Sequence, residues 1–67
     1  MIINNVSVLI GKRKLNVAET ARIAGLKYST VQNLYKDETK GIEFETLNKL
    51  CYALDCSVND LFTYEPD

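Results

Sequence analysis

A helix predicted over residues 28–36, "YSTVQNLYK", has side chains of opposite character on its two sides. At about 100° per residue, Val31, Leu34 and Tyr35 point toward one side. The other side carries residues that can donate or accept hydrogen bonds: Tyr28, Ser29, Gln32, Asn33 and Lys36. The pattern predicts one core face and one polar face that is free to bind another molecule.

Enzymatic chemistry finds little support in the composition. The chain has no histidine, so it offers no histidine-based acid, base or triad. It also has no glycine-rich phosphate loop and no cofactor fingerprint. We therefore expect a protein that is not an enzyme, with no cofactor, no metal ion and no evident small-molecule ligand.

The two cysteines, Cys51 and Cys56, are five residues apart and fall short of a zinc-ligand set. Their surroundings predict a structural role, with Cys51 in the core, Cys56 at a turn and both thiols reduced. A redox or metal switch remains the alternative.

The length and hydropathy are typical of a small globular protein. At 67 residues, the chain is expected to form a single domain with a small core. No apolar run approaches the roughly 18 residues that a membrane span requires, and the first residues lack the pattern of a signal peptide. We expect a cytoplasmic protein without a membrane partner.

The charges are distributed unevenly along the chain, although the net charge is only −1. Residues 1–41 carry seven basic and three acidic side chains, a net charge of +4. Residues 42–67 carry one basic and six acidic side chains, a net charge of −5. Such a division suits a domain that presents one end to a polyanion.

Apolar spacing predicts four or five short helices, and no stretch alternates for long enough to predict a strand. The first helix is predicted over about residues 3–14. Its basic residues 12–14 form either a solvated helix end or a group from which one side chain reaches a phosphate. Asn16 and Glu19 have the spacing of a capping box, which predicts that the second helix begins at Val17.

The second half of the chain carries the strongest periodic signal. After the charged loop at residues 36–41, apolar residues three or four apart predict one long helix: Phe44, Leu47, Leu50, Cys51 and Leu54. Ser57 and Asp60 again have the spacing of a capping box. They predict a last short helix that Pro66 closes.

Four small or apolar residues have the spacing of a helix-turn-helix. Ala21 is small where two helices must approach closely, and Gly25 supplies the positive φ that turns the chain. Val31 and Leu34 anchor the second of the two helices. This arrangement leaves the polar face free to enter a DNA major groove about 12 Å wide.

Two stretches of the sequence resemble the lambda-repressor and Cro-like (XRE) helix-turn-helix family. "NVAETARIAGLKYSTVQNLY" is similar to the family's motif, and "FETLNKLCYALDCSVNDLF" is similar to its fourth and fifth helices. The resemblance implies an all-α fold, a compact five-helix domain over residues 1–67 with the helix-turn-helix at about residues 17–36. It also implies a protein that binds operator DNA, commonly as a dimer, and represses or activates transcription.

The resemblance assigns roles to individual residues of this sequence. It makes residues 28–36 the recognition helix, with base-reading candidates Lys27, Tyr28, Ser29, Gln32 and Asn33. Glutamine and asparagine can pair with adenine, and lysine can reach guanine. Phosphate contacts are expected instead from Val17, Thr30, Lys36 and Lys40, which would position the domain without reading sequence.

The sequence departs from the family pattern at two positions. Many members place a glutamine at the start of the second helix, where it meets a phosphate. Val17 stands there, so the contact is either lost or made by the backbone amides of the helix N-terminus. Lys27 replaces the usual serine or threonine cap of the recognition helix, which removes a side-chain acceptor worth about 1 kcal/mol.

These features together predict a sequence-specific regulator of transcription that binds double-stranded DNA, with repressor as the expected type. A homodimer is expected because one recognition helix covers too few base pairs. Its interface candidates are the aromatic residues Tyr52, Phe62 and Tyr64. The alternative is a protein-interaction module or antitoxin-like adaptor, in which Gln32 and Asn33 are merely solvated and Tyr28 covers the edge of the bundle.

Overall fold

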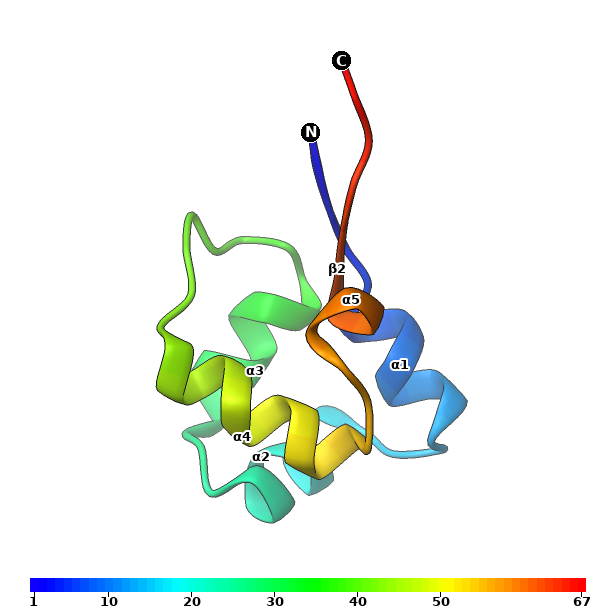
Figure 1. Cartoon of the computed structure of the whole chain (residues 1–67). Helices are drawn as coiled ribbons and strands as arrows, with labels where there is room; N and C mark the ends of the chain where they lie inside the picture. Colours follow the sequence, from blue (N-terminus) through cyan, green and yellow to red (C-terminus); the bar gives the residue numbers. More distant parts are fainter.

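The computed structural model describes all 67 residues as a bundle of five short helices with one small sheet. The elements follow in the order β1 (Ile2–Asn4), α1 (Val6–Lys12), α2 (Val17–Ala24), α3 (Tyr28–Tyr35), α4 (Phe44–Leu54), α5 (Val58–Leu61) and β2 (Phe62–Tyr64). In Figure 1, α3 lies to the left, α1 to the right and α4 in front. None of the helices has the length and apolar character that crossing a bilayer requires.

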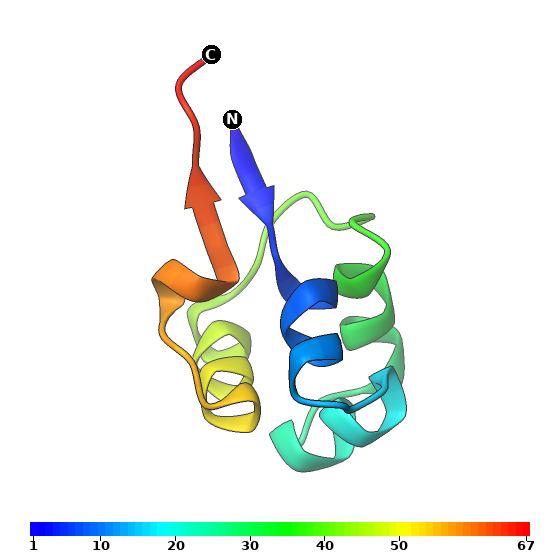
Figure 2. The same ribbon diagram turned by 90° about the vertical axis from the view of Figure 1, so that its right-hand side faces the viewer.

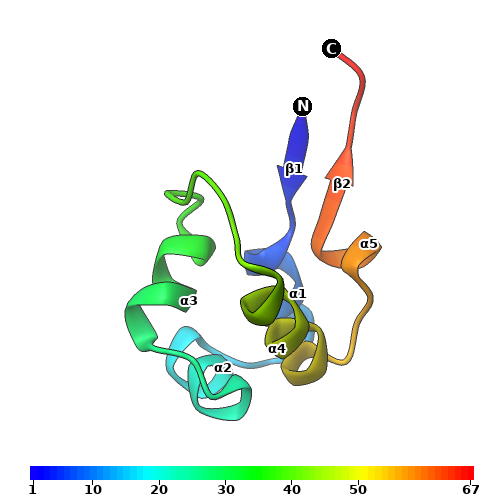
Figure 3. The same cartoon turned by 60° about the vertical axis from the view of Figure 1, so that its left-hand side comes forward.

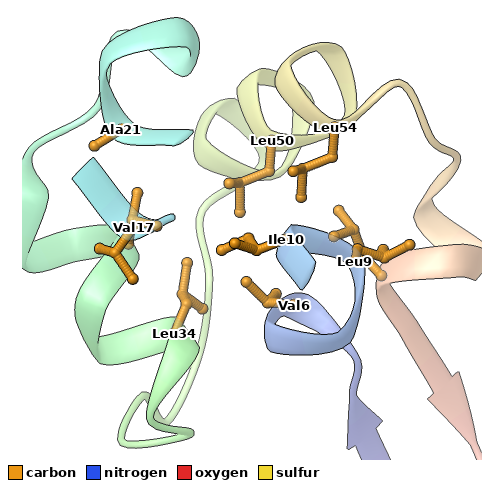
Figure 4. Close-up of a cluster of buried hydrophobic side chains, with 10 residues drawn as sticks. Val6, Leu9, Ile10, Val17, Ala21, Leu34, Leu50 and Leu54 are labelled. Atoms are coloured by element: carbon orange, nitrogen blue, oxygen red, sulfur yellow. The ribbon is translucent and has the colours of Figure 1, made fainter. Parts of the chain in front are cut away.

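One hydrophobic core holds the helices together. Its ten buried residues come from all five helices: Val6, Leu9, Ile10, Val17, Ala21, Val31, Leu34, Leu50, Leu54 and Leu61. Figure 4 shows the side chains of α1 and α4 meeting those of α2 and α3. Because Val31 and Leu34 belong to this cluster, their predicted role as anchors of α3 is confirmed.

The predicted start and end of α2 are confirmed by their hydrogen bonds. The side-chain oxygen of Asn16 accepts from the backbone amide of Glu19 at 2.8 Å, and the Glu19 carboxylate accepts from the Asn16 amide at 3.2 Å. This reciprocal pair is a capping box. Gly25 ends the helix with φ 69°, and the Leu26 amide donates to the Ala21 carbonyl at 2.9 Å. The turn between α2 and α3 is therefore fixed by local chemistry.

The prediction of an all-α fold was wrong in one respect, because β1 and β2 pair as an antiparallel ribbon. Ile3 lies opposite Thr63 in this ribbon, which extends beyond the helices (Figure 2). Three-residue strands are too short to produce a visible alternation in the sequence. Their pairing depends on the helical bundle, which brings distant parts of the chain together.

The ribbon also corrects two predicted helix boundaries. The first helix was predicted to begin near residue 3, but α1 begins at Val6 because residues 2–4 pair with β2. The last helix was predicted to run to Pro66, but α5 ends at Leu61 and the chain continues as β2. Ile3 and Phe62, both predicted to lie on helices, lie on the two strands instead.

Two aromatic residues predicted to be buried are exposed. Phe44 has the spacing of the buried stripe of α4, but its side chain is 88% exposed, because it lies in the first turn while the core residues of this helix, Leu50 and Leu54, lie in its second half. Tyr35 was predicted to point into the core and is 45% exposed at the end of α3. The remaining stripe is confirmed, with Leu50 and Leu54 fully buried and Leu47 and Cys51 packed against the core.

Side chains from the first part of the chain cap two helix ends. The Arg13 guanidinium donates to the carbonyl oxygens of Leu54 and Asp55, each at 2.7 Å, and so satisfies the C-terminal end of α4. The Asn4 side-chain amide donates to the Leu34 carbonyl at 3.0 Å at the end of α3. Arg13 therefore stabilises the fold. One interpretation of residues 12–14 was a solvated helix end, and for Arg13 that interpretation is wrong.

Candidate nucleic-acid interface

The five residues predicted to read bases lie on one exposed side of α3 and its N-cap position. Four are exposed, Lys27, Tyr28, Ser29 and Asn33, while Gln32 is half-buried. None of their side chains takes part in the hydrogen bonds or ion pairs that hold the fold together. Their donors and acceptors are therefore free to bind a ligand.

Helix α3 is held firmly on the opposite side and at its end. Val31 is fully buried, and Leu34 is nearly so. The carbonyl of Asn33 accepts from the Glu38 amide at 2.9 Å, and that of Leu34 accepts from Asn4. A helix fixed in this way presents its polar side chains on a rigid support, which favours specific recognition.

The N-cap residue of α3 supplies no side-chain oxygen to cap the helix, as predicted. Lys27 adopts extended backbone angles, φ −69° and ψ 144°, but makes no side-chain capping bond. Its carbonyl accepts from the amides of Thr30 and Val31 at 3.1 and 3.3 Å. The sequence therefore places a cation at the position where a capping oxygen would stabilise the helix.

We predict that Lys27→Ser stabilises the domain and weakens its binding to DNA. Serine supplies the missing oxygen, which raises the free energy of unfolding by about 1 kcal/mol. The same change removes a positive charge from the exposed polar side of α3. Denaturant unfolding and a DNA titration of the same protein sample measure both effects. An unchanged DNA affinity would show that Lys27 does not contact DNA.

Three of the four residues predicted to contact phosphate lie on α3 or in the segment that follows it, and the fourth, Val17, begins α2. Lys36 is the C-cap residue of α3, Lys40 lies in the following loop, and both are exposed. Thr30 is half-buried near the start of the helix. The Val17 side chain belongs to the core, so only the backbone amide of Val17 could make the expected phosphate contact. The capping box uses the amide of Glu19 and leaves the first amides of α2 without a helical partner.

Two threonines near this surface had no signal in the sequence. Thr39 and Thr46 line a depression of about 430 Å³ together with Thr30 and Asn33. Thr39 lies in the loop between α3 and α4, and Thr46 lies in the first turn of α4. A loop has no periodicity that could place Thr39, and only the packing of α4 against the bundle brings Thr46 beside α3.

The charge division along the sequence is not a clean division in space. Glu43 and Glu45, from the acidic half, line a second depression together with Lys27 and Lys49. Glu45 and Lys49 form an ion pair at 3.2 Å. The start of α3 is therefore flanked by charges of both signs, which tempers the positive potential expected there.

The two cysteines lie close together at the end of α4, away from the polar side of α3. Both are half-buried and reduced, and the Cys56 amide donates to the Cys51 carbonyl at 3.1 Å. Burial, with Cys51 and Asp60 nearby, raises the pKa of the Cys56 thiol from 9.0 to about 11. A thiol that stays protonated is a poor nucleophile, so the structural interpretation of this pair is favoured.

We predict that the stability falls between about pH 9 and about pH 11 because the pKa of Cys56 is higher in the folded protein than in the unfolded chain. In this range the unfolded chain loses the proton first, so alkali stabilises the unfolded state. Below pH 9 the effect is absent. Denaturant unfolding at about pH 8 and about pH 10.5 measures it, and Cys56→Ala is the reference. An equal loss in both proteins would assign the effect to other groups.

Comparison with known proteins agrees with this arrangement. The family described as the Cro/C1-type HTH DNA-binding domain matches residues 5–67. The "Uncharacterized HTH-type transcriptional regulator YozG" of Bacillus subtilis (strain 168) is 33% identical over 66 residues, which cover 98% of this chain and 79% of that protein. The match spans all five helices and includes the turn at Gly25 and the polar side of α3. The chain belongs to the Cro/C1-type helix-turn-helix family of DNA-binding domains.

Proposed function

We propose that this domain binds double-stranded DNA in a sequence-specific manner and acts as a transcriptional repressor. The observation that carries the proposal is the free polar side of α3, supported on a core-anchored helix-turn-helix. The family match supports DNA as the ligand. The similar protein from Bacillus subtilis carries the name of a transcriptional regulator, which supports a regulatory role.

Recognition would follow from the placement of α3 in the major groove. Gln32 and Asn33 can each form two hydrogen bonds with adenine, and Lys27 can donate to guanine. Tyr28 and Ser29 would add contacts at the N-terminal end of the helix. Lys36 and Lys40 would neutralise phosphates, and the free amides of α2 would bind another.

Repression by such a domain requires only occupancy of a site that overlaps a promoter. A homodimer would provide enough contacts for selectivity, because each α3 covers only a few base pairs. Two half-sites about one helical turn of DNA apart, roughly 34 Å, would match two recognition helices related by a two-fold axis.

Selection of bound sites from random duplex DNA tests the proposal directly. The expected result is a palindromic consensus. The affinity should fall with a log–log salt slope of about −4 if Lys36 and Lys40 of each of the two subunits neutralise phosphates. A reporter gene with the selected site in its promoter should be repressed. Absence of enrichment at low salt, together with a protein that co-purifies, would favour the interaction module instead.

A further inference from the structure

The carboxylate of Glu43 has no partner within the fold. Glu43 is exposed at the N-cap position of α4 and makes no side-chain capping bond there. Other carboxylates of the second half of the chain are paired, since that of Asp60 accepts from the Ser57 amide at 2.9 Å and that of Glu45 pairs with Lys49 at 3.2 Å. The capacity of Glu43 to accept hydrogen bonds is therefore free for a ligand.

Two depressions beside α3 share Glu43 in their lining. One, of about 430 Å³, also contains Thr30 and Asn33, and the other, of about 340 Å³, contains Lys27 and Thr30. Lys27, Thr30 and Asn33 are three residues apart, so they follow one flank of α3 from its N-cap position. Figure 3 shows the segment that leads from the end of α3 to the start of α4. It brings Glu43 beside the flank that ends at Asn33.

The position of Glu43 is fixed by the packing of α4. Its carbonyl accepts from the Leu47 amide at 3.0 Å, and Leu50 and Leu54 of the same helix are fully buried in the core. A side chain carried by a core-anchored helix is presented more precisely than one on a free loop. Glu43 thus has a defined place relative to the polar side of α3.

An unpaired carboxylate at this place is unfavourable for general binding to DNA, because phosphates repel it. Glu43 is the only charged residue of the depression that contains Asn33, so no lysine there compensates for it. The repulsion is offset where the DNA supplies a hydrogen-bond donor. In the major groove the donors are the exocyclic amino groups of cytosine and adenine.

We propose that Glu43 determines specificity by accepting a hydrogen bond from the N4 amino group of one cytosine in each half-site. The inference rests on the proposed function, since it takes α3 to lie in the major groove. Cytosine fits a carboxylate best, because its groove edge offers a donor and no acceptor. Adenine places its N7 acceptor beside its amino group, and guanine and thymine present carbonyl oxygens. Glu43 thereby rejects the other bases through repulsion as well as selecting cytosine.

A purely structural role for Glu43 predicts different behaviour. A negative charge at the N-terminal end of a helix stabilises that helix modestly. In that case substitutions of Glu43 change the stability of the domain and leave the base preference as it was. The measurement that separates the two roles is therefore the preferred DNA sequence, together with the fold of each variant by circular dichroism.

Selection from random duplex DNA with the wild-type protein, Glu43→Ala and Glu43→Gln tests the inference. The wild-type consensus should contain one cytosine per half-site that Glu43→Ala no longer prefers, while the other positions are unchanged. The preference for cytosine over thymine there should fall from at least about fivefold to about one. Glu43→Gln should prefer adenine at the same position, because a glutamine amide matches both the donor and the acceptor of adenine.

Glu38→Gln is the matched control for the loss of a negative charge. Glu38 is exposed in the segment after α3, where its amide donates to the Asn33 carbonyl at 2.9 Å, but it lines neither depression. Glu38→Gln and Glu43→Ala should both bind unrelated duplex DNA more tightly than the wild-type protein, because each removes a charge that phosphates repel. Only Glu43→Ala should change the consensus.

The outcomes distinguish this inference from the proposed function. A consensus shared by the wild-type protein and both Glu43 variants would overturn the inference and leave DNA recognition by α3 standing. The same change of consensus in Glu38→Gln would also overturn it, because a general effect of charge would then explain the preference. No enrichment by the wild-type protein would reject the proposed function itself.

Discussion

Gln32→Ala and Asn33→Ala should each reduce the affinity for the selected DNA site, and the double substitution should abolish sequence-specific binding. Each bidentate contact with adenine contributes about 1–3 kcal/mol of discrimination, which corresponds to roughly 5-fold to 150-fold in affinity. Neither side chain supports the fold through a hydrogen bond. The expected result is therefore a folded protein that still binds DNA weakly, with the salt dependence of the wild type.

A matched control separates the loss of a contact from a general effect of asparagine removal. Asn59 lies exposed on α5, so Asn59→Ala should leave the DNA affinity unchanged. Lys36→Ala should instead weaken binding to all sequences and reduce the magnitude of the salt slope by about two, because each subunit of the dimer loses one phosphate contact. Titration of the selected site and of a scrambled duplex measures both quantities. Specific binding that persists in the double variant would mean that α3 does not read the bases.

Leu50→Ala has the largest expected effect on stability. The Leu50 side chain is fully buried at the centre of the core. Its removal loses apolar burial and leaves a cavity, which costs about 2–5 kcal/mol. A domain of this size has a total stability of about 5 kcal/mol or little more, so a large share of the variant is unfolded at 37 °C.

Thermal unfolding followed by circular dichroism measures this effect, with Val8→Ala as the control. Val8 lies half-exposed on α1 outside the core, so its removal should change the stability by about 0.5 kcal/mol or less. Cognate DNA should raise the melting temperature of Leu50→Ala, because ligand binding stabilises only the folded state. A melting temperature equal to that of the wild type would contradict the central place of Leu50 in the core.

Local chemistry made much of the helix-turn-helix predictable from the sequence. The capping box at Asn16 and the left-handed turn at Gly25 are specified by residues close together in the chain, and both were predicted correctly. The buried positions of Val31 and Leu34 followed from helical periodicity. These features place the polar side of α3, which is why its residues could be named in advance.

The features that could not be predicted depend on contacts between distant parts of the chain. The strands β1 and β2 exist because the bundle brings residues 2–4 beside residues 62–64. Phe44 has the periodicity of a core residue, and only the absence of a covering element leaves it exposed. Periodicity shows that a residue shares a direction with buried neighbours, but it does not show where the neighbouring elements end.

The same long-range contact links the two ends of the chain to α3. Pairing β1 with β2 closes a loop of nearly the whole chain, so its entropy cost is among the largest in the fold. Helices form from local contacts first, and the ribbon is expected to form late and open early. Asn4 lies in β1 and donates to the last turn of α3. Opening of the ribbon would therefore remove one of the hydrogen bonds at the C-terminal end of α3, which couples the order of this helix to a contact made late in folding.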